Sequence, residues 1–181
     1  MTMVIQRKEY MNKLIAFKDK QLIKVITGIR RCGKSTLLEI YQNWLLEHGT
    51  EKAQILSINF EDIDFEELTD YRRLYSYLKE RLVPGKVTYI FLDEIQHVED
   101  FPKVVDSLYI KKNVDIYITG SNAYMLSSEI ATLISGRYVQ IEMLPLSFKE
   151  YMESTGSMAD RGVKYAEYLE NSSYHIPGKA I

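Results

Sequence analysis

The stretch VITGIRRCGKSTLL, residues 25–38, carries the strongest structural signal in the chain. It begins as an apolar run typical of a buried strand and ends as an apolar run at helical spacing. Between the two, residues 28–35 read GIRRCGKS and match the phosphate-binding template G-x-x-x-x-G-K-[ST]. Because the match falls between a predicted strand and a predicted helix, it indicates a phosphate-binding loop (P-loop) rather than a chance turn.

Each part of this template has a physical purpose. Gly28 and Gly33 lack a Cβ, so the backbone can wrap around a phosphate with its N–H groups pointing inward. The helix that follows adds the partial positive charge of its N-terminus. Lys34 would reach the β- and γ-phosphates, the Ser35 hydroxyl would bind Mg²⁺, and Thr36 would contact the α-phosphate. The residues that we expect to contact the nucleotide are Gly28, Ile29, Arg30, Arg31, Cys32, Gly33, Lys34, Ser35 and Thr36.

Three residues of the loop allow two interpretations each. Arg30 and Arg31 are either solvated loop charges or a source of positive potential near the phosphates. Cys32 is interpreted as a filler of the loop, although a helix N-terminus and Lys34 beside it favour an acidic thiol.

Strands and helices alternate along the chain. The strands are near-continuous apolar runs, which favours an α/β fold with a parallel sheet covered by helices on both faces. The predicted strands are residues 21–28, 54–60, 87–94, 115–121 and 138–143. The predicted helices are residues 7–21, 34–48, 65–82, 100–111 and 123–135.

A second motif is YIFLDEIQ, residues 89–96, an apolar strand that ends in two acids. In P-loop proteins an acid at this position holds Mg²⁺, which assigns Asp93 to the metal together with Ser35. The adjacent carboxylate can activate or orient an attacking water, so Glu94 is the candidate base. The competing interpretation, in which both acids only cap the next segment, is disfavoured by the P-loop upstream.

A base next to the metal acid resembles the division of P-loop proteins that has an extra strand between the P-loop strand and the acidic strand. Residues 115–121 would be that strand. After it, Asn122 is placed to contact the γ-phosphate or hold the water, or else to cap the next helix. Thr119 and Ser121 are weaker candidates for the same role.

The segment ISGRY, residues 134–138, places Arg137 just before the last strand. An arginine delivered to the γ-phosphate stabilises charge in the transition state. Supplied by a neighbouring copy, it would make hydrolysis depend on assembly. The alternative is a surface or ion-paired arginine.

The composition is that of one globular domain: 181 residues, 46% hydrophobic and 27% charged. The formal net charge is -2 and there is no basic stripe, so a nucleic-acid partner is not supported by the sequence.

One cysteine excludes an internal disulfide and suits a reducing cytoplasm. The chain begins without the apolar core of a signal peptide, and no window approaches a membrane span. We therefore expect a cytoplasmic protein with no membrane partner.

Five segments of the chain together resemble the AAA-type ATPase domain of the AAA_14 group of bacteria and archaea. They cover most of residues 20–151 and are LIKVITGIRRCGKSTLL, INFED, YIFLDEIQHVEDF, ITGSNAYML and SGRYVQIEMLPLSFKEY. The double arginine in the loop and the LPLSFKEY segment make the resemblance more specific than a P-loop alone. It implies an αβα sandwich with a five-stranded, mainly parallel core sheet, ATP and Mg²⁺ as ligands, and the sensor and arginine roles for Asn122 and Arg137.

Members of that group usually continue into a helical lid and a C-terminal domain of poorly understood function. We therefore expect an ATPase domain over residues 1–152 and a polar, truncated remainder over residues 153–181, in which the tail NSSYHIPGKAI, residues 171–181, has little core signal. A lid-borne second sensor would be missing, so we expect slow turnover.

Three functions are compatible with these motifs. The first is ATP hydrolysis with Mg²⁺ that drives a conformational change in an unidentified partner or in an assembly of identical chains. The second is a nucleotide-dependent switch without hydrolysis, and the third is a small-molecule phosphotransferase. The paired acids Asp93 and Glu94 favour hydrolysis, and the lack of an N-K-x-D element argues against a GTPase.

Overall fold

The structure is a computed structural model that describes residues 7–121, 134–155 and 161–171. Its centre is a five-stranded, all-parallel sheet with the strand order β2-β3-β4-β1-β5. The strands are β1 (Ile23–Gly28), β2 (Ile55–Asn59), β3 (Thr88–Asp93), β4 (Val114–Gly120) and β5 (Tyr138–Met143). The α-helices within the described ranges are α1 (Lys8–Ala16), α2 (Lys34–Glu47), α3 (Tyr71–Glu80), α4 (Phe101–Tyr109), α7 (Phe148–Thr155) and α8 (Arg161–Asn171). Short 3₁₀ helices are η1 (Lys52–Gln54), η2 (Ile63–Thr69) and η3 (Ile95–His97).

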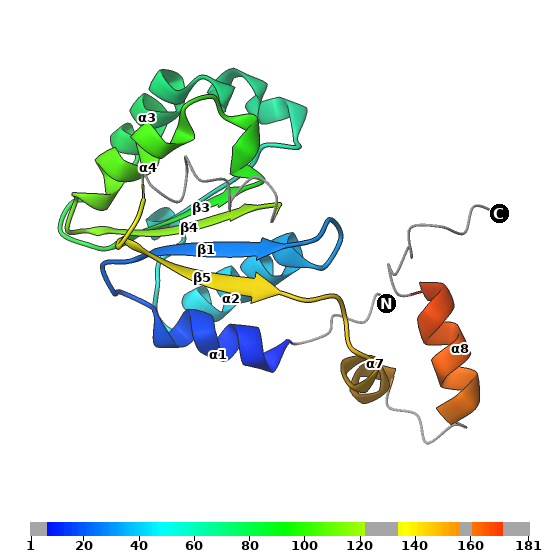
Figure 1. The fold of residues 1–181 in the computed structure, drawn as a ribbon. Coiled ribbons are helices and arrows are strands. Elements are labelled where there is room, and N and C mark those ends of the chain that lie inside the picture. The colour runs from blue at the N-terminus through cyan, green and yellow to red at the C-terminus, as the bar shows by residue number, and fades with distance from the viewer. Residues whose placement is uncertain (1–6, 122–133, 156–160, 172–181) are drawn as a thin grey trace.

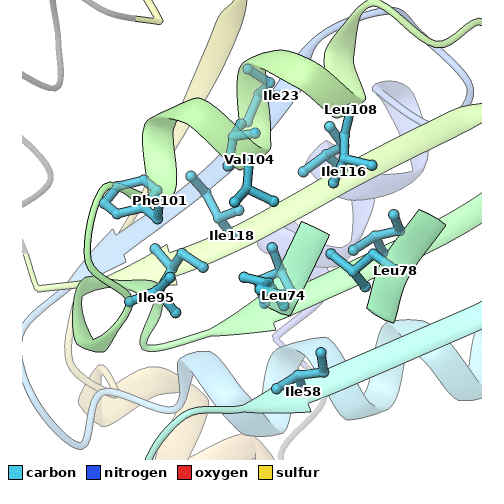
Figure 2. Close-up of a cluster of buried hydrophobic side chains, with 14 of the residues drawn as sticks. Ile23, Ile58, Leu74, Leu78, Ile95, Phe101, Val104, Leu108, Ile116 and Ile118 are labelled. Atoms are coloured by element: carbon cyan, nitrogen blue, oxygen red, sulfur yellow. The ribbon is translucent and has the colours of Figure 1, made fainter. Parts of the chain in front are cut away.

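Helices cover both faces of the sheet, so the predicted αβα sandwich is confirmed (Figure 1). On the face under α3 and α4, Leu74 and Leu78 of α3 and Val104 and Leu108 of α4 form one buried cluster with strand residues such as Ile118 (Figure 2). Each of these side chains is at most 1% exposed. The apolar faces of both helices therefore close this side of the core.

A second cluster fills the face under α1 and α2. Leu37, Tyr41 and Leu45 of α2 pack there with Phe91 of β3 and Tyr117 of β4. Because the central strands are covered on both faces, every residue of β1 and β3 is buried, which explains their near-continuous apolar sequences.

The order of the central strands decides where a ligand can bind. β4 lies between β1 and β3, which confirms the extra strand predicted between the P-loop strand and the acidic strand. Since all five strands run the same way, the carboxyl ends of β1, β3 and β4 meet at one edge of the sheet. Ligands of open α/β sheets bind outside that edge.

Two predicted helices end or begin elsewhere than the sequence suggested. The helix predicted over residues 65–82 is wrong in its first part, because α3 begins only at Tyr71. Asp70 explains the break, since its carboxylate accepts hydrogen bonds from the backbone N–H groups of Arg72 and Arg73 and so caps α3. The first helix ends at Ala16 rather than residue 21. The helix predicted over residues 123–135 lies largely outside the described residues.

Residues 161–171, which belong to the remainder predicted after residue 152, are helical and pack against the segment after β5. They form α8, in which Tyr168 is buried and donates a hydrogen bond from its hydroxyl to the Leu146 carbonyl. The Tyr168 ring lies 5.5 Å from that of Phe148 on α7. In the described part of the chain, no helix is both long and apolar enough to cross a membrane.

Candidate functional site

The loop between β1 and α2 begins and ends at the two glycines of the template. A Cβ on Gly28 would lie 2.5 Å from the Met143 carbonyl oxygen and 2.6 Å from the Cys32 sulfur, so the close contact between the loop and the end of β5 requires glycine. Gly33 has φ of 95°, a left-handed conformation, directly before α2 starts at Lys34. The sequence therefore specifies both ends of the loop.

A cavity of about 400 Å³ lies against this loop. Most of its lining comes from the residues predicted to contact nucleotide, joined by two acids. The lining residues are Arg30, Arg31, Gly33, Lys34, Ser35, Thr36, Glu61 and Glu94. Glu61 follows β2 and lies 3.6 Å from Arg30, both side chains being largely exposed.

Lys34 joins the loop to the end of β3. Its side chain is 4% exposed, and its Nζ donates hydrogen bonds to the carbonyls of Gly28 and Ile29, each with a donor–acceptor distance of 3.3 Å. The same Nζ lies 3.3 Å from Glu94 Oε1. The ammonium group predicted to bind phosphate and the carboxylate predicted to act on water thus lie beside the same cavity.

The two acids at the end of β3 are held by β4. The Thr119 hydroxyl donates to Asp93 Oδ1 and accepts a hydrogen bond from the Glu94 backbone N–H over 2.9 Å. Thr119 is fully buried, so one hydroxyl holds both the Asp93 carboxylate and the Glu94 backbone. Sequence reasoning ranked Thr119 below Asn122, which lies outside the described residues. Thr119 is the polar residue that the described part of β4 brings to the site.

Glu94 is held in an uncommon conformation. Its φ is 53°, in the left-handed region that costs a non-glycine residue of order 1 kcal/mol or more. Its Oε2 accepts a hydrogen bond from Gln96 Nε2 over 2.5 Å, and the Gln96 Oε1 is buried without a partner in the described part of the chain. Sequence reasoning missed Gln96, for which the only signal was its position two residues after the predicted base.

The predicted metal residues supply the right type of ligand. Ser35 lies in the first turn of α2 and lines the cavity, and Asp93 ends β3 with its carboxylate mostly buried. Hydroxyl and carboxylate oxygens are the ligands that Mg²⁺ prefers. The donor set therefore fits a magnesium ion bound through one or two protein oxygens.

Cys32 does not have the acidic thiol that the sequence suggested. Burial raises the pKa of Cys32 and outweighs the opposing charges of Lys34 and Arg7. The residue instead packs in the core cluster below α2. It is a filler of the loop, as the other interpretation held.

Arg137 lies at the opposite end of the sheet from the P-loop. Its carbonyl accepts a hydrogen bond from the backbone N–H of Ile23, at the start of β1, whereas Gly28 at the other end pairs with Met143. The strand between them is roughly 17 Å long at 3.3 Å per residue. The Arg137 guanidinium forms an ion pair with Asp106 of α4. Within one chain, Arg137 and the cavity are therefore kept apart.

Comparison with known sequences identifies the family. Residues 20–152 match the AAA domain family AAA_14. The chain belongs to this family of AAA domains. An uncharacterized protein of Haemophilus influenzae is 42% identical over 171 residues, which are 91% of this chain and 42% of that protein. The uncharacterized protein MJ1544 of Methanocaldococcus jannaschii is 36% identical over 136 residues, 72% of this chain and 28% of that protein. The chain thus spans less than half the length of either relative.

Solved structures agree on the fold. The AMPPCP-bound DnaA of Aquifex aeolicus superposes with a TM-score of 0.58 at 16% identity, over 90% of this chain and 54% of that one. C. elegans PCH-2 also gives 0.58, at 13% identity, over 83% of this chain and 46% of that one. Identities this low establish the αβα architecture alone. Family membership adds that this is a nucleotide-binding, ATPase-like domain.

Proposed function

We propose that this chain binds ATP with Mg²⁺ and hydrolyses it, and that the cycle drives a conformational change in a partner or an assembly. The observation that carries the proposal is the 3.3 Å approach of Lys34 Nζ to Glu94 Oε1 beside the cavity. It brings the group that would hold the β- and γ-phosphates close to the group that would act on water. A hydrolase needs both groups at one place.

Residues at the ends of β3 and β4 and in the first turn of α2 have distinct roles in this proposal. Glu94 orients the water and accepts its proton, while Gln96 holds the second carboxylate oxygen in place. Ser35 and Asp93 would hold Mg²⁺, which would supply positive charge to neutralise the phosphate oxygens. Thr119 keeps Asp93 and the Glu94 backbone in register. Asn122, if it acts as a sensor, would add a contact to the γ-phosphate.

The arginine step requires a second copy of the chain. Because Arg137 lies at the far end of the sheet from its own P-loop, it can complete only the site of a neighbour. Its ion pair with Asp106 is about half exposed and therefore weak, so the guanidinium can be released to a neighbour at small cost. We propose a homo-oligomer on this basis, located in the cytoplasm.

One observation supports a second candidate, a nucleotide-dependent switch without hydrolysis. Both carboxylate oxygens of Glu94 are engaged, one near Lys34 and the other by Gln96. A carboxylate held this way must change partners before it can act on water. A nucleic-acid partner has less support: Drosophila ORC, which superposes with a TM-score of 0.51 at 10% identity, was solved bound to DNA, but the present chain has a net charge of -2.

Phosphate release from Mg·ATP, compared between the wild type and Glu94→Gln, tests the proposal. We expect Glu94→Gln to bind ATP as the wild type does and to release phosphate about 10²–10⁴-fold more slowly, because the water loses its base. The rate per chain should rise with protein concentration in the wild type, and Arg137→Ala should remove that rise.

Glu61→Gln is the matched control, because Glu61 lines the same cavity but is paired with Arg30. Its turnover should stay close to that of the wild type. Equal and negligible turnover in the wild type and Glu94→Gln, with ATP bound by both, would establish the switch instead. Loss of turnover in Glu61→Gln alone would move the base to Glu61.

A further inference from the structure

A buried arginine outside the cavity connects the P-loop to the segment after β5. Arg7 precedes α1 and is 6% exposed. Its Nε and Nη2 donate to the two carboxylate oxygens of Glu150 over 3.0 and 3.3 Å. Its Nη1 donates to the carbonyl oxygens of Cys32, over 3.2 Å, and Leu144, over 2.7 Å. Nη2 also approaches the Pro145 carbonyl at 3.4 Å. The guanidinium therefore joins three segments that are far apart in the sequence.

The contact with Cys32 matters because of peptide geometry. The Cys32 carbonyl and the Gly33 N–H belong to one planar trans peptide, so they point in opposite directions. Gly33 lines the P-loop cavity, whereas Arg7 lines a different cavity together with Leu144 and Glu150. A donor that holds the carbonyl on the Arg7 side thus holds the Gly33 N–H on the other side. A charged donor also polarises the peptide and strengthens its N–H as a donor.

We infer that Arg7 is a positioning residue that aims the Gly33 N–H at a bound phosphate and, through Glu150, couples the P-loop to α7. The inference rests on the proposed nucleotide binding and names how that site is organised. It also gives a role to the LPLSFKEY segment, residues 144–151, which the proposed catalysis does not use. In Figure 1 the start of α1 and the end of β5 both lie on the side of the molecule where α7 is found.

The surroundings of Arg7 are built to keep it in place. The Tyr10 ring lies 4.6 Å from the guanidinium carbon, and the Tyr10 hydroxyl accepts a hydrogen bond from the Leu144 backbone N–H. Burial alone would raise the pKa of Glu150, but hydrogen bonds from Ser147 and Arg7 outweigh burial and lower it. Glu150 is therefore a carboxylate at neutral pH and neutralises the buried guanidinium.

Nucleotide affinity separates a positioning role from a merely structural one. We expect Arg7→Gln to weaken binding of ADP and of Mg·ATP alike by roughly tenfold, the loss of about one charged hydrogen bond at the loop. Lys8→Gln is the matched control, because Lys8 lines the same outer cavity and is exposed. It removes one positive charge from the same surface and should leave both affinities unchanged. Isothermal titration calorimetry measures all of them on proteins whose folding is checked by circular dichroism.

The coupling to α7 is read by amide hydrogen exchange. In the wild type, saturating ADP should slow exchange over residues 148–155. Glu150→Gln should lose less than tenfold in ADP affinity. It should nevertheless show no slowing of exchange, because the paired hydrogen bonds between the Arg7 guanidinium and the Glu150 carboxylate are broken. Equal slowing in the wild type and Glu150→Gln would overturn the coupling.

The possible outcomes distinguish this inference from the proposed function. If the wild type binds ADP and Arg7→Gln binds it equally well, the positioning role is wrong and the P-loop function stands. If the folded wild type binds neither nucleotide, the proposed function fails and this inference fails with it. If Arg7→Gln does not fold, Arg7→Lys tests the positioning role instead, since a lysine ammonium cannot make the several hydrogen bonds of the guanidinium. A loss of affinity in Arg7→Lys supports the role, and unchanged affinity overturns it.

Discussion

The two ends of the sheet each contain a buried lysine beside a carboxylate, but among the residues that the structure describes only the carboxyl end has the features of a binding site. At the carboxyl end, Lys34 is 4% exposed and approaches Glu94, which is 15% exposed. At the amino end, Lys24 of β1 and Asp115 of β4 form an ion pair with side chains 0% and 2% exposed. The pair at the amino end is the more deeply buried of the two.

The groups around the amino-end pair satisfy one another. Lys24 Nζ donates to Asp115 and, over 2.8 Å, to the Lys20 carbonyl. The Asp115 carboxylate also accepts from the Tyr117 hydroxyl over 3.0 Å and from the Asp19 backbone N–H over 2.9 Å. Burial raises the pKa of Asp115 and lowers the pKa of Lys24, so the surroundings oppose both charges. This pair serves the packing of α1 and its following turn onto the sheet.

The carboxyl end differs in what its pair faces. Lys34 and Glu94 line a cavity, and the backbone beside them turns through a left-handed glycine at a helix N-terminus. The first backbone N–H groups of α2 have no acceptor within the helix, so donors remain beside a space that a ligand can enter. The comparison teaches that burial of an ion pair identifies a site only when the pair also faces such a space.

The largest expected effect tests the amino end. Lys24→Met should lower the free energy of unfolding by about 3–5 kcal/mol, because it leaves the Asp115 charge buried and unpaired. Adding Asp115→Asn removes that charge and keeps an oxygen for the Asp19 N–H, so the double variant should recover roughly 2 kcal/mol or more. Urea unfolding measures both. A double variant no more stable than Lys24→Met would show that the charge is not the cause.

At the carboxyl end we expect the loss of the lysine to lower nucleotide affinity rather than the stability of the fold. Lys34→Met should weaken Mg·ATP binding by about 100-fold or more, since in the proposed function it removes charged hydrogen bonds to two phosphates. Its free energy of unfolding should change by no more than about 1–2 kcal/mol, because Glu94 faces the cavity and water can solvate it. Calorimetric titration and urea unfolding on the same sample give both numbers. Undiminished affinity in Lys34→Met would contradict the assignment of the P-loop.

The smallest effects are expected for two buried threonines, one at each end of the sheet. Thr119 binds Asp93 and the Glu94 N–H, and Thr88 at the start of β3 accepts a hydrogen bond from the Val83 N–H over 3.0 Å. Replacing either by valine should cost about 1–2 kcal/mol of stability. Only Thr119→Val should also raise, by a few-fold, the Mg²⁺ concentration needed for half-maximal ATP binding. A similar Mg²⁺ dependence in both variants would mean that Thr119 does not serve the metal residues.

The parts of the site that lie within short segments could be predicted from the sequence. The P-loop template spans eight positions, and its glycines and lysine have the expected places because local backbone geometry dictates them. The position of Asp93 and Glu94 at the end of β3 could be predicted because they follow an apolar run. The order of the central strands followed from that acid pair, and the sheet confirms it.

The parts that depend on contacts between distant segments could not be predicted. Thr119 reaches Asp93 across 26 positions and Arg7 reaches Glu150 across 143, and no local pattern marks either pair. The start of α3 could in principle be predicted, since Asp70 is a residue type that caps helices. The apolar periodicity on both sides of Asp70 instead predicted one continuous helix. The positions of Gln96 and of the packed Tyr168 likewise required the folded chain.

The location of Arg137 has a consequence for how copies of the chain could associate. If each copy offers this arginine to one neighbour at one end of its sheet and receives it from a different neighbour at the other end, contacts run head to tail and the two surfaces are different. An open row of such copies always leaves its terminal member without a donor. Only closure into a ring gives every copy a completed site, so turnover per chain would report whether the ring has closed.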